Sequence, residues 1–149
     1  MDSIKITTGA VRLCINDDPE RVIEFNPTDV LWAERFYNLI GELEAKRAEL
    51  MERAEQLDAA GGTDANGLPT NMGAGLALLR ETCEFLRERI DYLFGPGTSQ
   101  TVFGDAMTLD MFEQFFTGIT PYVQSARSGK VERYSKPVRS KSKGKKVMR

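Results

Sequence analysis

Three groups of residues carry side chains that could bind a metal ion or a phosphate, but none has the spacing that such a site needs. Segment 17–20 holds three carboxylates, yet its spacing is not that of an EF-hand loop, so a solvated turn is expected. The glycine-rich segment 73–75 precedes a helical pattern but lacks the strand and the Gly-Lys-Ser/Thr of a phosphate loop. Glu84, Glu88 and Asp91 alternate with arginines, as on an ordinary solvated helix face. The sequence therefore predicts no metal and no phosphate site.

The absence of histidine removes the commonest catalytic and metal-binding side chain. Ser-His and Cys-His nucleophile pairs cannot form, and neither can histidine-based zinc or iron sites. Cys14 and Cys83 are too few and too far apart for a disulfide scaffold, and both lie in apolar periodic segments, so we expect buried free thiols. No two carboxylates stand isolated in an apolar setting that would separate their pKa values. We therefore predict no enzymatic activity, no catalytic residue and no cofactor.

The C-terminal segment carries a charge opposite to that of the rest of the chain. Residues 127–149 contain ten Lys and Arg and one acid, Glu132, for a net of about +9, whereas residues 1–126 carry about −11. Such asymmetry is typical of an acidic folded body with a basic interaction tail. The tail could bind nucleic-acid phosphates, with an affinity that falls steeply with salt, or an acidic protein surface, and composition favours neither. Its candidate partner-binding residues are Arg139, Lys141, Lys143, Lys145 and Lys146.

A cluster of aromatic residues precedes the tail. Phe112, Phe115 and Phe116 lie with Ile119 on one face of a predicted helix. Packing in the core is the ordinary use of such a face. The alternative is an exposed apolar patch for a partner or a second copy, so the three Phe residues are also candidate partner-binding residues.

Short strands are predicted at the N-terminus. Residues 11–15 alternate apolar and polar side chains with period two, and turn signals lie at 8–9 and 16–19. We expect an antiparallel β-meander of two or three strands over residues 4–25, which needs a helix to cover its apolar face.

Two helices should follow and fold back on each other. The first begins after Asn26, a candidate N-cap, with Pro27 in the first helical position, and runs to about Ala60. The second helix carries an unbroken apolar seam between Leu76 and Leu93. The glycine-rich connection between the helices favours an antiparallel hairpin, because each helix carries one apolar stripe. That seam consists of Leu76, Leu79, Cys83, Leu86, Ile90 and Leu93.

A Phe-rich helix capped by Thr108 should complete the folded part, and Gly118 and Pro121 should limit or kink it. The predicted class is α+β, mainly α, with one acidic domain over residues 1–126. Residues 127–149 should form a flexible basic tail that is disordered when free. No apolar run is long enough to span a membrane, and the first residues lack the pattern of a signal peptide, so a cytoplasmic location is expected.

The overall layout resembles the small tail assembly chaperones, and related minor tail proteins, of long-tailed phages and prophages of Gram-positive bacteria. In such proteins a short β element leads into a long helix, then further helices, then a Lys-rich end. The segments that carry the resemblance are Ile4-Lys5-Ile6-Thr7-Thr8-Gly9, Glu24-Phe25-Asn26-Pro27-Thr28-Asp29 and Ala33-Glu34-Arg35-Phe36-Tyr37-Asn38-Leu39.

The resemblance implies a protein that binds the coiled-coil tape measure protein during tail assembly, can self-associate, and acts in the bacterial host cytoplasm. It implies no fixed functional residues. Many such families also make a longer product by frameshifting, and Lys143-Gly144-Lys145-Lys146 is compatible with slippery codons. Two other functions stay open: a structural tail protein retained in the virion, and a small nucleic-acid-binding regulator that uses the basic tail.

Overall fold

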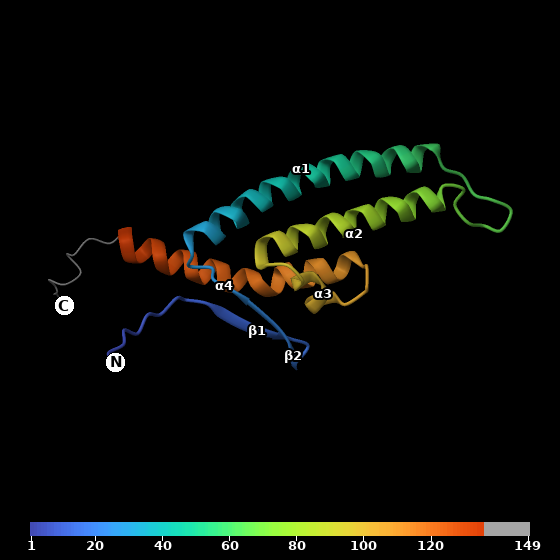
Figure 1. Ribbon diagram of the computed structural model, residues 1–149. Coiled ribbons are helices and arrows are strands. Elements are labelled where there is room, and N and C mark those ends of the chain that lie inside the picture. The colour runs from blue at the N-terminus through green and yellow to red at the C-terminus, as the bar shows by residue number, and fades with distance from the viewer. Residues whose placement is uncertain (136–149) are drawn as a thin grey trace, which may run out of the picture.

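The computed structural model describes the backbone of residues 1–135 and the side chains of residues 1–127, and it is mainly helical with one β-hairpin (Figure 1). The predicted α+β, mainly α class is thereby confirmed. The elements in chain order are β1 (Val11–Ile15), β2 (Asp18–Phe25), α1 (Val30–Ala60), α2 (Met72–Phe94), α3 (Thr98–Phe103) and α4 (Leu109–Ser135).

The β element is a two-stranded antiparallel hairpin. Leu13 pairs with Ile23, and the apolar side chains of both strands face the core. Asn16 and Asp17 both have positive φ, which is the geometry of a tight two-residue hairpin turn. Residues 4–6 form no strand, so the third strand that the sequence allowed is absent from the described residues.

The N-cap of the first helix lies three residues later than predicted. Asp29 is the N-cap, and its Oδ1 accepts a hydrogen bond from the Leu31 amide at 2.9 Å. The prediction of Asn26 as the cap is therefore wrong. Its Oδ1 instead accepts from the Thr28 amide at 3.1 Å, in the turn that leads from β2 into the helix. The predicted end at Ala60 is confirmed.

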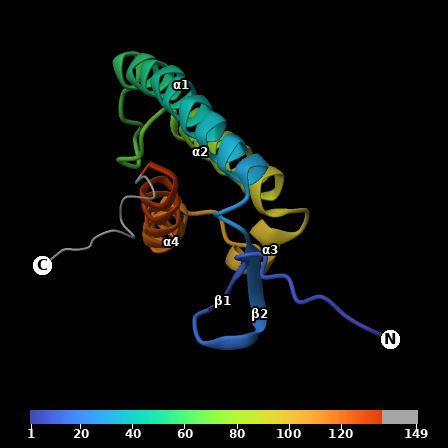
Figure 2. The same cartoon turned by 90° about the vertical axis from the view of Figure 1, so that its left-hand side faces the viewer.

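Helices α1 and α2 form the predicted hairpin, and α4 lies against only part of it. Figure 2 shows α4 on the β1 side of the β-hairpin and α3 beside β2. The core lies between these elements and is rich in aromatic rings. The ring centres of Phe25 and Trp32 are 5.4 Å apart, and those of Phe94 and Phe115 are 5.3 Å apart. Offset and edge contacts of this kind stabilise beyond the area they bury.

The short helix α3 was not predicted from the sequence. It follows Gly97, which has φ +86°, and its Val102 and Phe103 are buried in the core. Asp91 of α2 accepts hydrogen bonds from the Ser99 amide at 2.7 Å and the Ser99 hydroxyl at 3.1 Å. A carboxylate that looked solvated in the sequence therefore fixes the start of α3.

Helix α4 is longer than predicted. It continues through Pro121 to Ser135, past Arg127, where we expected the helical body to end. Pro121, which was expected to limit or kink the helix, thus lies inside α4. The basic candidates between Arg139 and Lys146 lie outside the described residues.

Candidate functional site

The Phe cluster of α4 belongs to the core. Phe112 and Phe115 are buried, and Phe116 is half-buried against the same cluster. The ring centres of Phe103 and Phe112 are only 4.6 Å apart. Core packing is therefore the structural role of this face, and it does not form an exposed patch.

The described residues hold no evident chemical centre. No group of three His, Cys, Asp or Glu side chains among them is placed to hold a metal ion. Cys83 is buried, and burial raises the pKa of its thiol, which disfavours the reactive thiolate. Cys14 is exposed, contrary to our expectation, because the alternation that turns Leu13 and Ile15 inward turns Cys14 outward. Within the described chain, no helix combines the length and apolar character of a membrane span.

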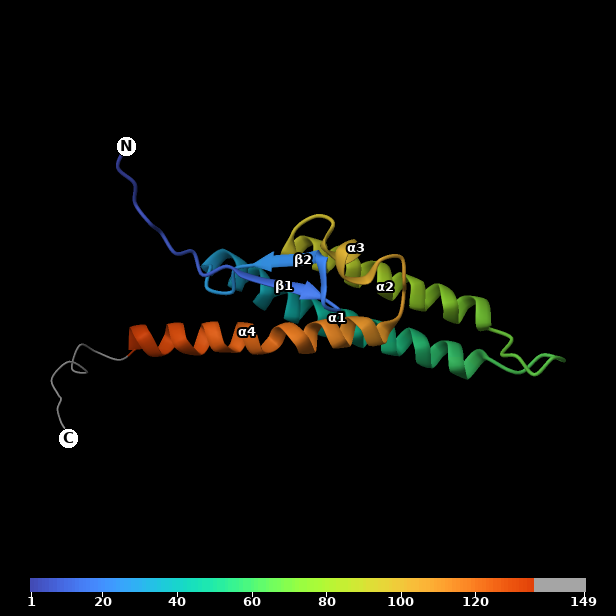
Figure 3. The same ribbon diagram turned by 90° about the horizontal axis from the view of Figure 1, so that it is seen from below.

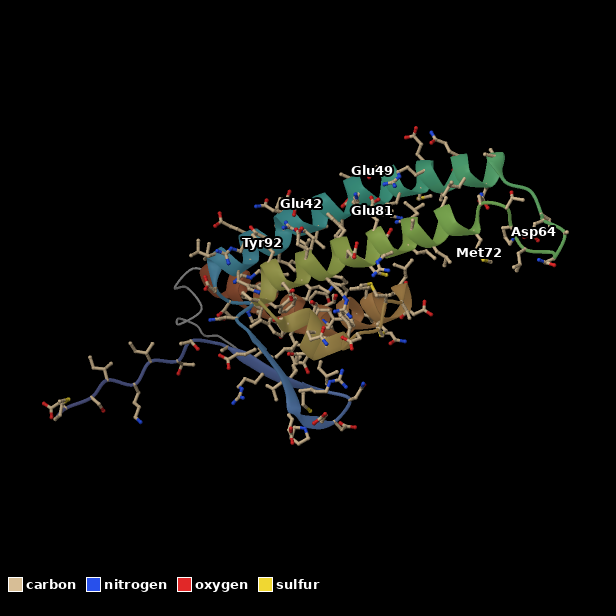
Figure 4. All side chains as sticks on the ribbon, turned by 45° about the vertical axis from the view of Figure 1, so that its right-hand side comes forward. Glu42, Glu49, Asp64, Met72, Glu81 and Tyr92 are labelled. Atoms are coloured by element: carbon tan, nitrogen blue, oxygen red, sulfur yellow. The ribbon has the colours of Figure 1, made fainter. Side chains whose placement is uncertain are left out.

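The half of the helical hairpin nearest its loop, residues 46–81, is held by charges where an apolar seam would be expected. Lys46 and Arg53 occupy seam positions of α1, and both bind Glu81 of α2 (Figure 4). Two nitrogens of Arg53 donate to the Glu81 carboxylate at 2.6 and 3.0 Å, and Lys46 Nζ donates at 3.3 Å. The hydrogen bonds from Arg53, then those from Lys46, lower the pKa of Glu81 to about 2.

Other carboxylates of α1 pair either within the helix or with α2. Within α1, Glu49 pairs with Lys46 at 3.0 Å and with Arg53 at 3.6 Å. Glu42 binds Arg89 of α2 at 3.1 Å. Glu42 and Glu81 therefore join the two helices to each other, whereas Glu49, Glu84 and Glu88 pair within their own helix.

Glu81→Gln should lower the melting temperature at pH 7, because it removes the charge that Arg53 and Lys46 share. The pKa of Glu81 falls from its ordinary 4.5 to about 2 on folding, so its contribution is present above about pH 5 and is lost as the pH falls toward 2. The difference in melting temperature between parent and variant should shrink over that window. Glu84→Gln, on the same helix and paired only with exposed Arg80, is the control, with little effect at any pH. A difference independent of pH would contradict the assignment.

An apolar stripe on α2 has no covering element in the described structure. Met72, Leu76 and Leu79 are 41%, 59% and 48% exposed. Leu76 and Leu79 belong to the predicted apolar seam of α2, which is covered from Cys83 onward and uncovered before it. The reason is that α2 extends past the first turn of α4, as Figures 1 and 3 show. Figure 4 places Met72 on the side of α2 that faces away from α1.

A second apolar surface lies between β1 and α4. This β1–α4 groove has a volume of about 370 Å³ and is lined mainly by apolar residues, with Asn16, Gln114 and Tyr122 among them. Its lining combines consecutive residues of β1 with one face of α4, and Ile23 of β2 and Val102 and Phe103 of α3 also contribute. The lining residues contributed by β1 and α4 include Leu13, Cys14, Ile15, Gln114, Gly118 and Ile119.

Both surfaces are suited to binding a protein segment, since they are apolar and bordered by charged or polar side chains. The sequence pattern could not separate exposed from buried seam residues, because both have helical spacing. No curated protein and no solved structure matches the chain. Residues 20–147 match the protein family described as a family of unknown function, DUF6673. Because the match covers most of the chain, the protein belongs to DUF6673.

Proposed function

We propose that this protein is a non-enzymatic binding protein that covers an apolar helix of a partner, and that it serves as a phage or prophage tail assembly chaperone for the tape measure protein. The single observation that supports the binding role is the exposed apolar stripe of Met72, Leu76 and Leu79. A stripe with i, i+4, i+7 spacing matches the mode in which one amphipathic helix packs against another.

The surroundings of the stripe favour a helical partner. The Glu81 network fixes α2 against α1 through charges on the opposite side, so the stripe can be occupied without disturbing the hairpin. The loop beyond it adds Leu68, which is also exposed. A rigid apolar face on a charged helical hairpin can shield an apolar helix while keeping the complex in solution.

The more specific role rests on the resemblance in layout to tail assembly chaperones. A tape measure protein is a long helical chain that needs its apolar faces covered before the tube forms around it. The basic residues 127–149 would add a salt-sensitive tether to such a complex. The expected site of action is the bacterial host cytoplasm.

Replacing Leu76 and Leu79 together with Asp should weaken binding to the helical partner roughly tenfold or more, because charges would be placed in an apolar contact. The measurement is isothermal calorimetry with the partner recovered by pull-down. Both side chains are exposed, so the melting temperature should stay near that of the parent. Tyr37→Asp, at an exposed aromatic residue of α1, is the matched control and should bind normally. Equal binding by the parent and both variants would show that the stripe does not bind the partner.

The partner itself is best identified by a nuclease-treated pull-down of the tagged protein from producing cells, with mass spectrometry of the captured proteins and of mature particles. A large coiled-coil protein in the pull-down, with the bait absent from particles, supports the chaperone role. The bait in mature particles supports a structural tail protein instead.

The charge of residues 127–149 favours one other candidate, a small nucleic-acid-binding regulator. Its signature is association that nuclease abolishes and that weakens steeply as salt rises. Binding of nucleic acid would not use the apolar stripe, and we therefore place the regulator second to the chaperone.

A further inference from the structure

The β1–α4 groove is bordered by a strand edge without a partner strand. Within the described residues β1 pairs only with β2, and its consecutive residues Leu13, Cys14 and Ile15 line the groove, which places the unpaired edge of β1 beside it. The outer side of β2 is closed, because Arg21 donates hydrogen bonds to the carbonyls of Thr101 and Val102 in α3. The open edge is therefore on the β1 side alone. A strand edge beside an apolar helix face is a ready site for an added strand.

The N-terminal arm, residues 1–10, has the sequence of the missing strand. Ile4 and Ile6 alternate with Lys5 and Thr7, which is the period of a strand with one apolar face. Yet Ile4 and Ile6 are 86% and 80% exposed, and the arm forms no strand. The arm thus has the sequence of a strand with one apolar face, and the groove beside β1 offers a place for such a strand, but the two are not joined within one chain.

The arm does not reach the groove of its own chain. The carbonyl of Thr8 accepts hydrogen bonds from Asn26 Nδ2 at 2.6 Å and from Thr28 Oγ1 at 3.3 Å. Gly9 packs so closely on Thr28 that a side chain there would collide with its hydroxyl. These contacts direct the arm away on the side of β2, whereas α4 borders β1 on the other side (Figure 3).

We propose that the N-terminal arm of one copy binds in the β1–α4 groove of a second copy as a third strand along β1. Ile4 and Ile6 would face the apolar wall formed by α4, and Lys5 would lie on the outer face, where Cys14 is exposed. Gly118 leaves room for the added strand, since no atom lies within 4 Å of a Cβ built there. This self-association uses neither the apolar stripe nor the proposed helical partner.

Cys14 permits a direct test by disulfide crosslinking. One copy carries Lys5→Cys with Cys14→Ser, and the second, bearing a tag of different mass, keeps Cys14. After mild oxidation of the mixture, non-reducing gels should show the mixed species in clear excess over either copy crosslinked to itself. A mixed species no more abundant than the self-crosslinked ones would overturn the proposal. So would a disulfide within one chain when Lys5→Cys is made with Cys14 retained, because the arm would then fill its own groove.

Two further variants separate strand addition from other association. Ile4→Asp with Ile6→Asp, and independently Gly118→Leu, should abolish the mixed crosslink and shift sedimentation equilibrium toward monomer. Ile4 and Ile6 are largely exposed and a Cβ at Gly118 meets no atom within 4 Å, so folding should persist by circular dichroism. Tyr37→Asp, and Leu76→Asp with Leu79→Asp, should leave the crosslink unchanged. If the Leu76→Asp, Leu79→Asp variant loses binding to the helical partner but still forms the crosslink, the two proposals are independent. If the crosslink survives Gly118→Leu, the arm does not bind in the groove.

Discussion

Replacing Phe115 with Ala should lower the free energy of unfolding by about 3–5 kcal/mol, the range for large-to-small changes at buried aromatic positions. Its ring contacts Phe94 of α2 and Phe103 of α3, with ring centres 5.3 and 5.7 Å away, so the change leaves a cavity where three helices meet. Among the described residues of α4, Phe115 is one of four buried side chains that pack the helix on the rest of the protein, with Phe112, Ile119 and Val123, so we expect the cavity to loosen the helix. Denaturant unfolding followed by far-UV circular dichroism measures the loss.

Phe116, the next residue, provides the control for Phe115. It is half-buried and contacts the cluster at its margin, so Phe116→Ala should destabilise clearly less. A Phe115→Ala protein with the parent stability but without partner binding would contradict the core assignment. It would instead favour the exposed binding face that the sequence left open.

The helical hairpin could be predicted from the sequence because its signals are local. Period-3.6 apolar spacing indicates both helices, and the glycines after Ala60 and at Gly95 mark the C-terminal ends of α1 and α2 nearly to the residue, although both starts differ by a few residues. The Phe face of α4 followed from the same spacing, and Thr108 indeed lies just before that helix, with its hydroxyl accepting from the Met111 amide at 3.4 Å. The features that could be predicted are thus the helices themselves and the residues at their ends.

The remainder depends on contacts between distant segments. Whether Leu79 or Cys83 is covered depends on where α4 begins, and no spacing within α2 encodes this. The N-terminal arm has a strand pattern as good as that of β1, but Asn26 and Thr28 hold Thr8 off the sheet. The α3 helix has only six residues and too few apolar positions for a periodic signal. Both candidate binding surfaces therefore appear only once the tertiary packing is known.

The β-hairpin is held to α3 by Arg21, and Arg21→Ala should lower the free energy of unfolding by about 3 kcal/mol, since charge-assisted hydrogen bonds contribute roughly 1.5–3 kcal/mol each. The guanidinium donates from Nε to the Thr101 carbonyl at 3.0 Å and from a terminal nitrogen to the Val102 carbonyl at 2.6 Å. Both acceptors lie in the last turn of α3, where the carbonyls have no partner within the helix. Thermal and denaturant unfolding give the loss, and amide exchange of β2 should rise with it.

The stabilisation by Arg21 depends on the two-donor geometry of the guanidinium as well as on its charge. Arg21→Lys keeps the charge but cannot donate to both carbonyls in this geometry, so it should recover only part of the lost stability. Arg12 is the matched control, because it lies on the partner strand and pairs with Glu24 at 3.4 Å with both side chains largely exposed. Arg12→Ala should therefore change the free energy of unfolding by no more than about 1 kcal/mol. If Arg12→Ala and Arg21→Ala were equally mild, β2 would be held by apolar packing alone, and α3 would be docked by Val102 and Phe103 without help from the arginine.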